Sequence, residues 1–61
     1  MKQETKEYIE ETIEYLDDEI EVLELFISRN YEPMSYKLLK FSLSDKRVMK
    51  GILEDILSYE K

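Results

Sequence analysis

The sequence predicts an all-α protein, an antiparallel helical hairpin that dimerises into a four-helix bundle. Two long stretches repeat their apolar residues with the period of an α-helix. One proline separates the two stretches, and the 61 residues contain a single glycine, so little else interrupts a helix. Both stretches also carry more apolar residues than two paired helices can cover, which predicts a partner chain. We expect residues 1–61 to form one helical-hairpin domain.

The first helix is expected over residues 4–29. Its apolar residues follow one another at spacings of four and three, the heptad pattern of a helix that packs along one seam. Glu4 and Glu7 would lie in the first turn and Arg29 in the last, where their charges suit the helix dipole. The predicted seam consists of Ile9, Ile13, Leu16, Ile20, Leu23 and Ile27.

A turn is expected at residues 30–33 and a second helix over residues 34–59. Asn30 tolerates the conformation that closes a helix, and Pro33 prevents the first helix from continuing. Residues 42–45 contain good N-cap residues, so a second helix broken at this point is an alternative. The seam predicted for the second helix consists of Met34, Leu38, Phe41, Val48, Ile52 and Ile56, with Asp45 as a polar interruption.

The charges support the same hairpin. Residues 1–29 have a net charge of minus seven and residues 30–61 a net charge of plus one, so the two halves attract each other. A turn centred near residue 32 sets Leu16 opposite Val48 and Ile13 opposite Ile52. The same register predicts ion pairs between Glu24 and Lys40, between Asp17 or Asp18 and Lys46 or Arg47, and between Glu14 and Lys50.

A second apolar line on each helix predicts a protein interface. In an isolated hairpin these side chains would face water, so a second copy of the chain is the expected partner. A different protein on the same surface is the alternative. Gly51 in the second helix is either a point of close helix approach or a tolerated glycine. The predicted interface residues are Tyr8, Tyr15, Val22, Phe26, Leu39, Leu43, Leu53 and Leu57.

The composition excludes several kinds of chemistry. The chain has no His and no Cys, so it lacks the base of a Ser-His or Cys-His pair and the usual ligands of transition metals. We therefore expect no enzyme, no catalytic residues, no metal site and no cofactor. No stretch is apolar enough to cross a membrane and the N-terminus lacks an apolar signal core, which together predict a cytoplasmic protein.

The function expected from these features is protein interaction. A non-enzymatic helical bundle of this kind would act as a regulator, inhibitor or adaptor by means of its surface. The alternative is a nucleic-acid-binding helical dimer that uses the basic segment 37–50, although the net charge of minus six makes binding to a polyanion unfavourable. Its candidate residues are Lys37, Lys40, Lys46, Arg47 and Lys50.

Overall fold

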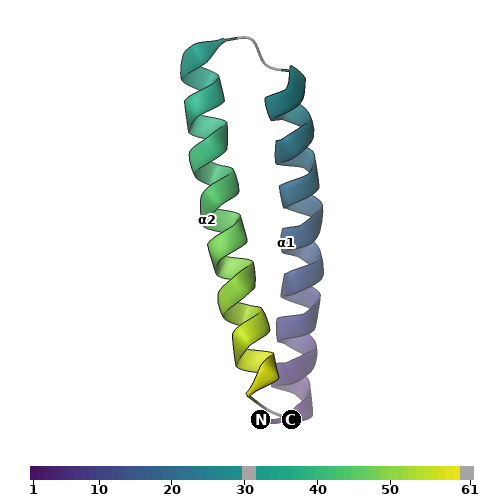
Figure 1. Cartoon of the computed structure of the whole chain (residues 1–61). Helices are drawn as coiled ribbons and strands as arrows, with labels where there is room; N and C mark the ends of the chain where they lie inside the picture. Colours follow the sequence, from purple (N-terminus) through teal and green to yellow (C-terminus); the bar gives the residue numbers. More distant parts are fainter. Residues whose placement is uncertain (30–31, 60–61) are drawn as a thin grey trace.

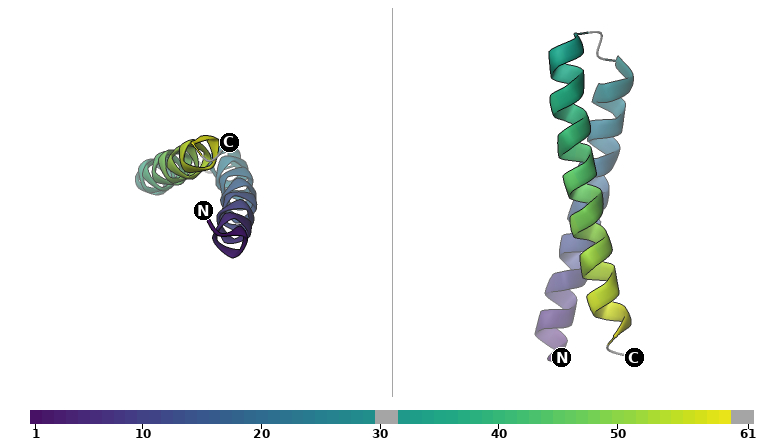
Figure 2. Two further views of the ribbon diagram at one scale, coloured as in Figure 1. Left: turned by 90° about the horizontal axis from the view of Figure 1, so that it is seen from below. Right: turned by 60° about the vertical axis from the view of Figure 1, so that its left-hand side comes forward.

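The computed structural model describes residues 1–29 and 32–59, and these form a hairpin of two α-helices. Helix α1 spans Gln3–Arg29 and helix α2 spans Pro33–Ser58. The two helices lie antiparallel and side by side, so the start of α1 meets the end of α2 (Figure 1). Their axes are inclined to each other, and the molecule measures 45 × 15 × 12 Å (Figure 2). The predicted all-α hairpin is confirmed.

The start of α2 lies one residue earlier than predicted. Pro33 belongs to the helix, because the first position of a helix needs no amide hydrogen and favours the fixed φ of proline. The Glu32 carboxylate caps this end, accepting hydrogen bonds from the amides of Met34 (3.1 Å) and Ser35 (2.7 Å). Bonds to Ser35 and Met34 favour the ionised form and lower the pKa of Glu32. The other predicted turn residues, Asn30 and Tyr31, lie outside the described residues.

Helix α2 continues without a break through residues 42–45. The single second helix is therefore confirmed, and the alternative of two shorter helices is wrong. Ser42, Ser44 and Asp45 are exposed, so their polar groups reach water without ending the helix. Continuity keeps Leu39 and Leu43 in phase with the leucines of the last two turns.

The inner surface of α1 is the predicted one. Ile9 and Leu16 are buried, and Leu16 is only 2% exposed. Partly buried side chains complete the line: Ile13, Ile20, Leu23 and Ile27.

The predicted seam of α2 is wrong. Its six apolar residues are all exposed, Met34, Leu38, Phe41, Val48, Ile52 and Ile56. The residues of α2 that face α1 come about one position later in the sequence than the predicted ones. This shift corresponds to a rotation of α2 by about 100° around its axis. Buried or partly buried residues make up this inner line: Leu39, Leu43, Lys46, Lys50, Leu53 and Leu57.

Charge explains why this line of α2 faces α1. The predicted seam would have placed the carboxylate of Asp45 against a helix that already carries ten acidic residues. The observed rotation places Lys46 and Lys50 there instead. The Lys46 ammonium lies 2.9 Å from the Glu19 carboxylate, and Lys50 pairs with Asp17. Attraction at these two positions replaces the repulsion that Asp45 would cause.

The individual ion pairs also differ from the predicted ones. Arg47 pairs with Glu24 at 3.3 Å, whereas Lys40 had been expected beside this carboxylate. The ammonium of Lys40 lies instead 5.0 Å from the centre of the Tyr36 ring. The predicted attraction between acidic α1 and basic α2 is thus present, but through other partners, because the rotation of α2 moves each cation.

The hairpin has a small core and a large surface. Only three side chains are buried in the described part of the chain, Ile9, Leu16 and Leu43. The accessible surface is 5115 Å². A compact monomer of 7.4 kDa exposes about 4,200 Å², so the hairpin exposes about 900 Å² more.

Candidate protein-interaction face

The residues on either side of each inner residue define two faces of the hairpin. Neighbouring residues of an α-helix are rotated by about 100° around its axis, so the residue before and the residue after an inner position point to opposite flanks. Both helices are right-handed and they run antiparallel. For this reason, the residues that precede inner positions lie on the same side of the hairpin in α1 and in α2.

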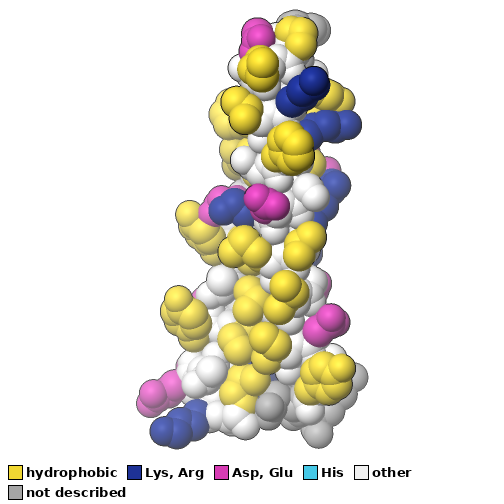
Figure 3. Space-filling view, turned by 90° about the vertical axis from the view of Figure 1, so that its left-hand side faces the viewer, with side chains coloured by type: hydrophobic (Ala, Val, Ile, Leu, Met, Phe, Trp, Pro, Cys, Tyr) yellow, Lys and Arg dark blue, Asp and Glu magenta, His cyan; other side chains and the backbone are white. Residues whose placement is uncertain are grey.

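The face formed by preceding residues is mainly apolar. Its apolar side chains are 39% to 70% exposed. Figure 3 shows hydrophobic side chains along the length of the hairpin, most densely in the half nearer the chain ends. We call this surface the apolar face and define it by Tyr8, Tyr15, Val22, Phe26, Leu38, Met49, Ile52 and Ile56.

The face formed by following residues is polar. On α1 the side chain after each inner residue is a carboxylate or a hydroxyl, and on α2 it is polar or, at Gly51, absent. We call this surface the polar face and define it by Glu10, Glu14, Asp17, Glu21, Glu24, Ser28, Lys40, Ser44, Arg47, Gly51, Glu54 and Ser58. The same hairpin therefore presents water-seeking groups on one side and exposed apolar groups on the other.

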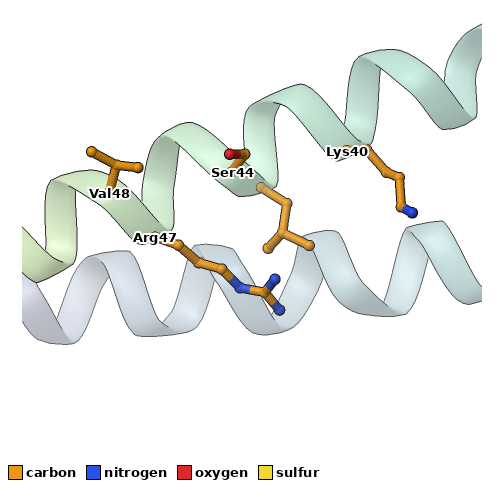
Figure 4. Close-up of a pocket in the computed structure, with 5 residues that line it drawn as sticks. Lys40, Ser44, Arg47 and Val48 are labelled. Atoms are coloured by element: carbon orange, nitrogen blue, oxygen red, sulfur yellow. The ribbon is translucent and has the colours of Figure 1, made fainter.

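A hollow of about 340 Å³ opens on α2 beside the polar face. Figure 4 shows Lys40 and Arg47 reaching from α2 towards α1, with Ser44 and Val48 on the outer side of α2. Arg47, which lines this hollow, also forms the ion pair with Glu24 of α1. The hollow is open to solvent and is lined by residues of α2.

A charged layer interrupts the apolar face near its middle. The Glu19 carboxylate bonds the Lys46 ammonium and also accepts a hydrogen bond from the Tyr15 hydroxyl. The bond from Lys46 and then the bond from Tyr15 lower the pKa of Glu19, and the bond to Glu19 raises the pKa of Lys46. The bond to Glu19 raises the pKa of Tyr15, because it stabilises the protonated hydroxyl. Charged side chains cross the surface near mid-length in Figure 3.

The sequence identified half of the apolar face. Tyr8, Tyr15, Val22 and Phe26 are exposed on it, as expected. The four leucines predicted for α2 are on the inner line: Leu43 is buried, and Leu39, Leu53 and Leu57 are partly buried.

Four exposed residues of α2 on the apolar face were not among the interface residues predicted from the sequence, and each lies one position before an inner residue of α2. They are Leu38, Met49, Ile52 and Ile56. The signal that could have found them is the position of Lys46 and Lys50, which suit an acidic neighbour better than Asp45 does.

The cations of segment 37–50 are distributed over several surfaces. Lys46, Arg47 and Lys50 are in ion pairs with α1, and Lys40 lies over the Tyr36 ring. Lys37 is exposed beside Phe41 in a surface hollow. The five candidates for nucleic-acid contact do not converge on one groove.

Gly51 does not mark a close approach of the helices. A Cβ added to this residue would meet no atom within 4 Å. Within the hairpin, the interpretation of Gly51 as a point of close helix packing is therefore wrong.

Comparison with other proteins assigns no family. No protein-family model, curated protein or solved structure gives a significant match to the chain. Among the residues that the structure describes, no group of three or more acidic side chains is placed to hold a metal ion. Neither helix, over its described length, is long and apolar enough to span a membrane.

Proposed function

We propose that this protein is a small, cytoplasmic, non-enzymatic interaction module that acts as a regulator, inhibitor or adaptor. In this proposal the apolar face binds a second copy of the chain, and the two hairpins form a four-helix bundle. The observation that carries the proposal is the difference between the two flanks of the inner line: eight exposed apolar groups from both helices share one flank, whereas the other flank is polar. The exposed Met34, Phe41 and Val48 of α2 lie outside this face. A monomer in water gains nothing from such a division.

The size of the surface supports a second copy as the occupant. The hairpin exposes about 900 Å² more than a compact chain of its mass, and a standard protein interface buries about 800 Å² on each partner. A bundle of two copies would also complete the core, since three buried side chains stabilise a 61-residue chain only weakly.

Two variants on either side of Ile27 test the proposal. Phe26 precedes this inner residue on the apolar face, and Ser28 follows it on the polar face. Phe26→Gln should shift the molar mass measured by light scattering from two chains towards one. Ser28→Gln, which places the same side chain on the opposite flank, should leave the mass at two chains.

The same measurement has a result that would contradict the proposal. If Ser28→Gln weakened the assembly as much as Phe26→Gln, the apolar face would not be the interface. If the unaltered chain stayed folded at the mass of one chain, a different protein would be the occupant. The contact residues to test would then be Tyr15 and Phe26, each by substitution with Ala.

Nucleic-acid binding has less support. Phosphate contacts need cations that point freely to solvent, and Lys46, Arg47 and Lys50 already pair with Asp17, Glu19 or Glu24. The discriminating assay is retention of a labelled duplex or hairpin RNA at low salt. Retention that falls steeply with salt and is lost on substitution of Lys46 and Arg47 by Glu would favour this alternative.

A further inference from the structure

Two arrangements of a two-fold dimer can bring the apolar faces together. In one, the two-fold axis runs along the bundle, both turns lie at the same end, and α1 of each copy neighbours α2 of the other. In the second, the axis crosses the bundle, the turns lie at opposite ends, and α1 neighbours α1 of the other copy. Neighbouring helices are antiparallel in both, so helix direction alone does not separate them.

The net charges of the helices distinguish the two arrangements. Helix α1 carries ten acidic residues against Lys6 and Arg29, a net charge of minus eight. Helix α2 carries five cations against Asp45, Glu54 and Asp55, a net charge of plus two. Placing α1 beside α1 of the other copy brings two strongly acidic helices together, whereas placing α1 beside α2 brings opposite charges together.

The charged layer of the apolar face also favours the arrangement with the two-fold axis along the bundle. Glu19 of α1 and Lys46 of α2 lie at the same height, since they form an ion pair of 2.9 Å. With the axis along the bundle, Glu19 of one copy comes beside Lys46 and Asp45 of the other, so it meets a cation as well as a carboxylate. With the axis across the bundle at this height, Glu19 would meet Glu19 and Lys46 would meet Lys46. Like charges at close range disfavour that arrangement.

We therefore propose that the two copies associate with both turns at the same end of the bundle, and that Glu19 and Lys46 set the alignment of the copies. The inference rests on the self-association proposed above. It adds that α1 of each copy packs against α2 of the other, with the charged layers of the two copies at the same height. A buried or half-buried polar layer of this kind fixes register in helical bundles.

Distances between spin labels test the arrangement. The chain contains no Cys, so one can be introduced at a chosen exposed position of α1: Gln3→Cys at one end, Arg29→Cys at the other, or Asp18→Cys near the middle as the control. Pulsed electron spin resonance on each labelled dimer gives the distance between the two copies' labels. Turns at the same end predict similar distances at all three positions, set by the width of the bundle.

The opposite arrangement gives a different pattern. With the axis at the height of Glu19, Gln3 lies 16 residues, or about 24 Å, from the axis, and Arg29 lies 10 residues, or about 15 Å, from it. The two labels would then be separated along the bundle by about 48 Å at Gln3→Cys and by about 30 Å at Arg29→Cys. Long distances at Gln3→Cys and Arg29→Cys with a short one at Asp18→Cys would overturn the inference and leave the self-association intact. A mass of one chain for the unlabelled protein would overturn both. Circular dichroism confirms that each labelled variant is folded.

Discussion

The apolar face and the polar face lie on opposite flanks of the inner line. The residue before an inner position belongs to the apolar flank, and the residue after it belongs to the polar face. Around Leu16 the preceding residue is Tyr15 and the following residue is Asp17; around Leu53 they are Ile52 and Glu54. On both helices the apolar residue precedes the inner position and the polar residue follows it. The antiparallel arrangement therefore collects the apolar residues on one side. The contrast between faces is therefore a property of the hairpin, since neither helix alone produces a shared surface.

The largest expected effect concerns the inner line that separates the two faces. Leu16→Ala removes the most buried side chain, and a substitution of this kind costs about 2–5 kcal/mol. Leu25→Ala is the control, because Leu25 is about half exposed and lies outside both the inner line and the apolar face. Urea unfolding at one fixed chain concentration measures both variants. Equal losses would mean that the inner line is wrongly placed.

Substitutions on the two sides of Leu53 compare the faces directly. Ile52→Gln removes apolar area from the apolar face, and we expect the dimer dissociation constant to rise about tenfold or more, because each dimer loses two such side chains. Glu54→Gln, on the polar face, should change it little. Sedimentation equilibrium gives both constants. A similar increase in the two variants would remove the distinction between the faces.

Gly51→Ala should stabilise the protein. The glycine lies inside α2, where alanine is favoured by about 1 kcal/mol, and the added methyl group meets no neighbour. Since Gly51 is on the polar face, the mass of the assembly should stay the same while the unfolding midpoint rises. A fall in stability, or a change of mass, would show that another chain approaches α2 at this residue.

The smallest expected effect is the loss of stability in acid. The folded protein lowers the pKa of Glu19 and of Glu32, so at moderately acidic pH the unfolded chain binds more protons at these positions than the folded chain. Their stabilising contribution is present above the ordinary Glu pKa and is lost as the pH falls through the lowered values. Unfolding curves between neutral and acidic pH measure this loss. Glu32→Gln should reduce its steepness, and an unchanged slope would contradict the capping role.

The sequence predicted α1 well because only one line of α1 suits an inner position. The residues after this line are acidic or hydroxyl-bearing and the residues before it include Glu19, so only the line through Leu16 is apolar throughout. The end of α1 and the start of α2 were also predictable to within a residue, since Arg29 and Pro33 are recognisable signals for these two helix ends.

The orientation of α2 could not be read from periodicity alone. Two apolar lines lie one residue apart on this helix, and each has a polar interruption, Asp45 in one and Lys46 with Lys50 in the other. The hydrophobic pattern gives the two lines nearly equal weight. The sign of the charge on α1 decides between them, and that decision depends on contacts between residues far apart in the sequence.

We propose that the apolar face binds a second copy of this chain. The molar mass of the unaltered protein in solution, measured by sedimentation equilibrium over a wide range of concentrations, tests this proposal. We predict twice the chain mass of 7.4 kDa, falling towards one chain only on strong dilution. A folded protein that remains at 7.4 kDa at every concentration would contradict the claim.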